Sequence, residues 1–146
     1  MPRFDDNDVS FEIPEGWVDR SCIVFEAPAR EGAFRSSVSV QHPPGQLEAF
    51  VQRRLARLSR LPSFEFRARE RLLVGGLRAE QLVFDWEHPD AGAVAQRLTL
   101  VVREDGSLLL VTDLGPAAER EAMKPRFDAL LASLAARPRE PARVAL

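Results

Sequence analysis

The sequence predicts an α+β domain, an antiparallel sheet of six or seven strands with two helical segments packed on one face. Seven short segments are rich in β-branched and apolar residues, and the turns between most of them are short, which favours antiparallel neighbours. Only two segments show helical periodicity, and runs of strands with segregated helices define this fold class. A length of 146 residues with 45% hydrophobic content is enough for one core. We therefore expect a single domain over residues 1–136, followed by a flexible tail over 137–146.

Turn-forming residues set the limits of the predicted strands. Gly75-Gly76 and Asp105-Gly106 are typical hairpin turns, and prolines and glycines separate most of the other segments. The predicted strands span residues 10–13, 21–27, 36–42, 64–74, 79–88, 93–104 and 107–114, with a hairpin loop at 30–32.

Two segments have helical periodicity. In residues 46–60 apolar side chains recur at three- and four-residue steps, and Pro62 ends the helix. A second stripe follows Gly115-Pro116 and includes Met123 and Phe127. Pro125 interrupts this stripe, so we expect a new helix to begin there.

Composition excludes several classes of partner. The 20 basic and 22 acidic residues give a net charge of -2, which does not favour nucleic acid. No window approaches the roughly 20 apolar residues of a membrane span, and the first residues lack the pattern of a signal peptide. We therefore expect a cytoplasmic protein without a membrane anchor. Cys22 is the single cysteine, so no intramolecular disulfide forms.

Several predicted strands are apolar on both faces instead of alternating with polar residues. Residues 22–25, 82–84, 98–102 and 108–111 show this pattern. Two helices on one face would leave the second face partly apolar and available to a partner. Coverage by the first strand, by loops, by the tail or by a second copy of the chain is the alternative.

Two polar residues lie among the apolar ones. On a helical wheel Arg54 falls within the stripe of Leu47, Val51 and Leu58, and Gln96 shares a strand face with Leu98. Polar groups in such places could bind the backbone or polar groups of a partner helix. The alternative is that Arg54 extends to water and Gln96 lies near a strand end.

The usual catalytic and cofactor-binding motifs are missing from the sequence. His42 and His88 each precede a proline at a strand end and have no ligand at useful spacing. Asp85 and Glu87 share a strand face, where charges usually form only the solvated side. We therefore expect no catalysis, no cofactor and no metal site.

Short motifs in a consistent order carry a resemblance to a known family. They are FEIPEGWVDRS at 11–21, FVQRRL at 50–55, LPSF at 61–64, VFDW at 83–86, AQRL at 95–98 and RFDALLASL at 126–134. Over residues 4–135 the chain resembles the DcrB-like, PsbP-like fold group, and within it the Eag adaptor chaperones of type VI secretion effectors.

The resemblance implies a homodimeric, non-enzymatic cytoplasmic chaperone. Its concave sheet face would hold the N-terminal transmembrane helices of a PAAR or Rhs-type effector before export. A dimeric binding module with a soluble protein partner is the alternative. The positions that match the family's client groove, together with Gln96 nearby, are Cys22, Val24, Ser37, Ser39, Arg54 and Leu98. Arg54 and Leu98 stand where the family has glutamines, and Cys22 is smaller than the usual aliphatic residue.

Overall fold

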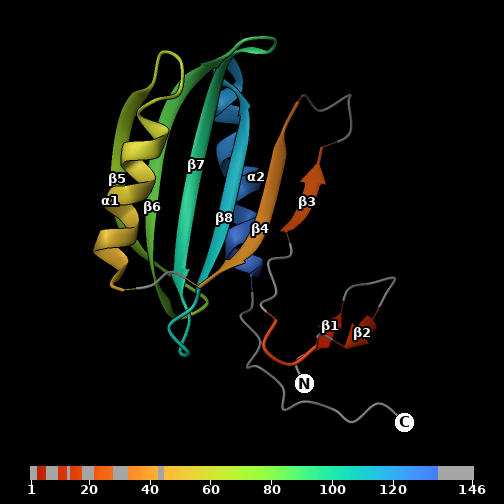
Figure 1. Ribbon diagram of the computed structural model, residues 1–146. Helices are drawn as coiled ribbons and strands as arrows, with labels where there is room; N and C mark the ends of the chain where they lie inside the picture. Colours follow the sequence, from red (N-terminus) through yellow and green to blue (C-terminus); the bar gives the residue numbers. More distant parts are fainter. Residues whose placement is uncertain are drawn as a thin grey trace.

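The computed structural model describes residues 3–5, 10–12, 14–17, 22–27, 33–42 and 45–134. Its main sheet has six antiparallel strands in the order β3-β4-β8-β7-β6-β5, and it is not closed into a barrel (Figure 1). The strands are β3 (Cys22–Glu26), β4 (Arg35–Gln41), β5 (Glu65–Val74), β6 (Leu77–His88), β7 (Gly92–Val102) and β8 (Leu108–Pro116). The predicted α+β fold class is confirmed. Each of these strands begins and ends within two residues of its predicted limits.

The first predicted strand is outside the main sheet. β2 (Ser10–Glu12) pairs with β1 (Arg3–Asp5), which the sequence analysis missed, to form a separate two-stranded sheet. Strands of only three residues are too short to show a clear alternation of apolar and polar residues in the sequence. The predicted loop at 30–32 and the tail at 137–146 lie outside the described residues.

The expectation that both helices pack on one face is wrong. α1 (Leu47–Leu58) connects β4 to β5 and buries Val51 against Leu98 and Leu100 of β7. α2 (Arg120–Ser133) packs Met123 against Ala95 of the same strand, three residues from Leu98. Odd and even positions of a strand point to opposite faces, so the helices cover opposite faces, as Figure 1 shows with α1 in front of the sheet and α2 behind it.

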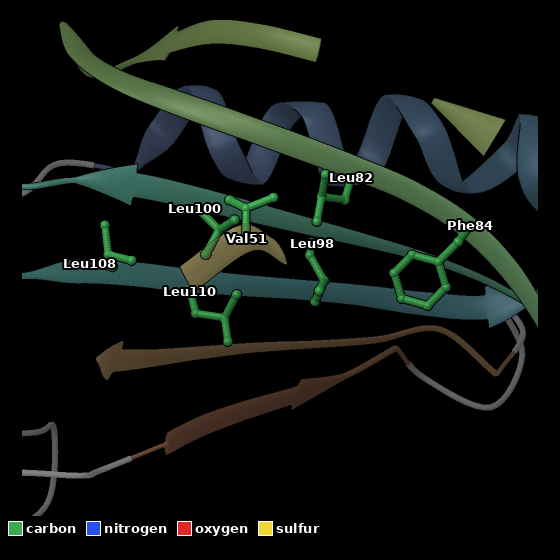
Figure 2. Packing of buried hydrophobic residues seen from close by; sticks show 7 residues of the cluster. All are labelled: Val51, Leu82, Phe84, Leu98, Leu100, Leu108 and Leu110. Atoms are coloured by element: carbon green, nitrogen blue, oxygen red, sulfur yellow. The ribbon is translucent and has the colours of Figure 1, made fainter. Parts of the chain in front are cut away.

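This arrangement explains why the central strands are apolar on both faces. Each face of β6, β7 and β8 has its own apolar cluster, one beneath α1 and two toward α2. Figure 2 shows the cluster beneath α1, with α2 behind the strands. Its buried members are Val51, Leu82, Phe84, Leu98, Leu100, Leu108 and Leu110. The two-sided apolar pattern therefore reflects, for the most part, a sheet covered on both sides.

α2 runs through Pro125 without starting a new helix there, which corrects the prediction. A proline inside a helix removes one backbone hydrogen bond and costs about 3 kcal/mol. Burial of Met123 and Leu131 on either side of Pro125 stabilises the continuous helix against this cost.

A charged network joins α2 to its face of the sheet. Arg97 of β7 lies 2.5 Å from Asp128 of α2 and 3.1 Å from the buried Asp113 of β8. The hydroxyl of Ser36 donates a hydrogen bond of 2.7 Å to Asp113. Burial raises the pKa of Asp113, whereas Lys124 and Arg97 lower the pKa of Asp128. These contacts link α2 to β7 and, through Arg97, to the buried Asp113 of β8.

Candidate binding surface

The strand register brings several predicted site residues to one face of the sheet. Val24 of β3 lies opposite Ser37 of β4, Ser37 lies opposite Thr112 of β8, and Thr112 lies opposite Leu98 of β7. Side chains of directly opposed residues point to the same face. This row of four therefore shares the face that α1 covers, which we call the α1 face.

Two neighbouring rows lie on the same face. Cys22 pairs with Ser39, and Ser39 pairs with Leu110. In the other row, Gln96 pairs with Leu114. All six strand residues predicted for the site thus lie on the α1 face, and the seventh, Arg54, lies on α1 itself.

Leu98 differs from the other five strand residues because it is buried. Its exposed fraction is 3%, and it belongs to the cluster beneath α1. Val24, by contrast, is 43% exposed, since α1 does not extend over β3. Leu98 was predicted to lie at the binding surface, but the structure places it in the core.

The part of the α1 face that α1 leaves open is formed by three strands. We call it the β3–β4–β8 surface, and its side chains are Cys22, Val24, Ser37, Ser39, Thr112 and Leu114. Cys22 and Val24 are exposed and the other four are half-buried. The surface combines apolar groups with hydroxyl groups. Thr112 and Leu114 were missed, although alternation along β8 from Leu110 would have found them.

Arg54 borders this surface. On the other flank of α1, Glu48 contacts Arg69 of the edge strand β5, with 2.6 Å between carboxylate and guanidinium. At 100° per residue, Arg54 lies about 120° from Glu48 around the helix, and Phe50 lies about 160° from it. The flank with Arg54 and Phe50 therefore faces away from β5, toward β8 and β4.

Arg54 is half-buried and has an unusual electrostatic setting. Its guanidinium lies 5.4 Å from the centre of the Phe50 ring. Burial, and then the charge of Arg57, lower the pKa of Arg54. By contrast, four arginines on or beside the sheet each contact a carboxylate, namely Arg67, Arg69, Arg97 and Arg120. No ion pair of this kind involves Arg54 within the described part of the chain.

Gln96 is held in place by a neighbouring side chain. The indole N–H of Trp86 donates a hydrogen bond of 2.8 Å to the amide oxygen of Gln96. Gln96 is half-buried, two residues from the buried Leu98. The hydrogen bond from Trp86 therefore fixes the amide group of Gln96 at the margin of the β3–β4–β8 surface.

The two edges of the main sheet differ in their protection. β5 carries a bulge between Phe66 and Ala68 and a run of charged residues, which discourage pairing with another strand. Among the described strands, β3 pairs with β4 alone, and both of its faces carry apolar side chains. Ile23 and Phe25, on the face opposite Val24, are 45% and 54% exposed.

Asp85 and His88 are engaged in local contacts. Asp85 is paired with Arg67 and Arg120, and the imidazole Nδ1 of His88 accepts hydrogen bonds from the backbone of Asp90 and Ala91. His88 thus closes its own turn. In the described ranges, no group of three or more histidine, cysteine, aspartate or glutamate side chains is arranged to hold a metal.

A hollow of about 510 Å³ opens at the N-terminal end of α1. Its acidic side chains are Glu48, whose pKa is lowered to about 2 mainly by the hydrogen bond from Arg69, and Glu80. Glu80 lies 2.6 Å from Arg69 and 3.5 Å from Arg71. These carboxylates therefore join α1 to β5 and β6 through ion pairs.

The fold defines a class: an antiparallel-sheet domain with one helix on each face, in which no described helix or loop covers the edge at β3. The DcrB family model matches residues 8–133, and the chain belongs to the DcrB family. The sequence matches no curated protein. No helix in the described ranges has both the length and the apolar character needed to cross a membrane.

Two solved structures have a similar fold. A Pseudomonas aeruginosa protein of unknown function has a TM-score of 0.79 at 21% identity, over 94% of this chain and 98% of that chain. LpqN, which is described as involved in cell envelope biogenesis of Mycobacterium tuberculosis, has a TM-score of 0.58 at 16% identity, over 75% of this chain and 67% of that chain. At these identities the likeness establishes the fold.

Proposed function

We propose that this DcrB-family protein is a cytoplasmic, non-catalytic adaptor chaperone that shields apolar helices of a client protein. The client would be the N-terminal transmembrane region of a type VI secretion effector, as for the Eag chaperones that its motifs resemble. The observation that carries the proposal is the β3–β4–β8 surface. In the described part of the chain, this is a sheet face that α1 leaves open, with exposed Val24 and Cys22 beside half-buried hydroxyl groups.

The composition of this surface suits an apolar helix with a few polar groups. Burying a large aliphatic side chain stabilises a complex by roughly 1.5–3 kcal/mol, which gives affinity. The hydroxyls of Ser37, Ser39 and Thr112 would pair with polar groups that the client cannot leave unsatisfied. Apolar contact would supply the affinity for the client helix, and the polar contacts would fix its position along the surface.

Replacement of Val24 by aspartate is expected to weaken client binding at least tenfold, because burying an unpaired carboxylate costs more than about 1.4 kcal/mol. The probe is a soluble carrier domain that bears an N-terminal segment of about 20 leucine and alanine residues. Its Kd for the chaperone is measured by fluorescence anisotropy. The matched control is Leu73→Asp, since Leu73 is 71% exposed on the opposite edge strand.

The control variant should bind the probe as the original chain does. An original chain that does not bind the probe would remove the chaperone proposal. Equal binding by Val24→Asp and the original chain would place the client elsewhere and favour a different partner, such as a soluble protein. Circular dichroism on both variants establishes that they are folded.

We also propose that two copies pair through β3. An antiparallel β3–β3 pairing centred on Val24 would place Ile23 of one copy opposite Phe25 of the other, on the face away from the client. Light scattering at micromolar concentration should give twice the mass of 16.3 kDa, and Phe25→Asp should reduce it to one chain. A monomeric mass for the original chain would contradict this pairing.

A further inference from the structure

Charged side chains lie along the margin of the β3–β4–β8 surface in the described part of the chain. At its margin Glu26 of β3 and Arg35 of β4 lie 4.0 Å apart and offset each other. Arg54 lies on the flank of α1 that faces away from β5, and the like charge of Arg57 acts on it. Within the described residues, this flank therefore carries a positive charge that no carboxylate contacts.

A partner that covered Arg54 would remove the remaining water from a guanidinium that is already half-buried. Phe50 offers the face of its ring, which is a weak substitute for an anion. A charge buried without a counter-charge is costly, and the group that best offsets an arginine is a carboxylate, which accepts two parallel N–H bonds. The geometry thus favours a partner that brings a carboxylate to this place.

We infer that Arg54 is a specificity-determining residue that selects apolar helices with an acidic side chain facing α1. The inference rests on the proposed function and names the chemistry of its client. Arginine has five N–H donors and no acceptor, so it cannot pair with a donor group as a glutamine at the same position could. Arg54 therefore favours a client that presents an acceptor over one that presents a donor.

The test uses the carrier probe with one aspartate in the apolar segment, placed in turn at four successive central positions to cover one helical turn. Matched probes carry asparagine at the same positions, and one probe is wholly apolar. Kd values are measured for the original chain, for Arg54→Gln and for Arg60→Gln, a control at an exposed arginine beyond the end of α1. Comparing ratios of Kd cancels the lower hydrophobicity of the polar probes.

For at least one position, the preference for aspartate over asparagine should be about tenfold larger in the original chain than in Arg54→Gln, a typical coupling for a close charge pair. Arg60→Gln should keep the preference. Equal preferences in the original chain and Arg54→Gln at all four positions would overturn the inference. If the wholly apolar probe still binds, the proposed function survives that result; if no probe binds, the proposed function itself fails.

Discussion

Leu98→Ala is expected to lower the free energy of unfolding by about 2–5 kcal/mol, because it opens a cavity in the cluster beneath α1. Val24→Ala should lower it by less than about 1 kcal/mol, since Val24 is 43% exposed and the alanine leaves little cavity. Equilibrium unfolding in urea measures both values.

The comparison is informative because the two residues share a row of the same sheet face. Val24 and Leu98 are separated only by Ser37 and Thr112, so secondary structure and face are matched. The difference between the two losses in unfolding free energy then measures how far α1 covers each position. Equal losses at the two positions would mean that β3 is packed as closely as β7 and would contradict an open β3–β4–β8 surface.

Gly115→Ala should lower the free energy of unfolding by about 1–3 kcal/mol, the usual cost of overpacking a core. A Cβ atom at Gly115 would lie 2.1 Å from Sδ of Met123 and 2.9 Å from Cδ1 of Phe34. The methionine can change rotamer, but the Phe34 ring is packed against Phe127 of α2, with 6.4 Å between ring centres. Thermal and urea unfolding measure the loss.

A double-mutant cycle identifies which contact causes the loss of stability in Gly115→Ala. In a Met123→Ala background the Gly115→Ala substitution should cost less, because the sulfur that it would displace is missing. Strictly additive losses would mean that the clash with Met123 is not the source of the instability. The cycle also tests whether α2 packs on this face in solution.

The two core variants and the surface variants address different parts of one fold. Helices on opposite faces stabilise β5 to β8, and neither of these two helices covers the β3 end of the sheet. Substitutions on the β3–β4–β8 surface should therefore cost less stability than substitutions beneath either helix.

Sequence periodicity by itself determined the strands of the main sheet and the extent of α1. Glycine turns separate the strands, and the two-residue period places Cys22 and Val24 on one face of their strand and Ser37 and Ser39 on one face of theirs. The same reasoning placed Arg54 within the inward stripe of α1. These features depend on local geometry, which the order of residues specifies.

Tertiary structure alone decided which helix covers which face. The sequence shows that β7 is apolar on both faces, but it does not show that Ala95 meets α2 while Leu98 meets α1. The burial of Leu98 and the exposure of Val24 follow from that choice, since one helix spans too few strands to reach β3. The pairing register of β3, β4 and β8 then set which side chains form the open surface. That register depends on contacts between residues far apart in the chain.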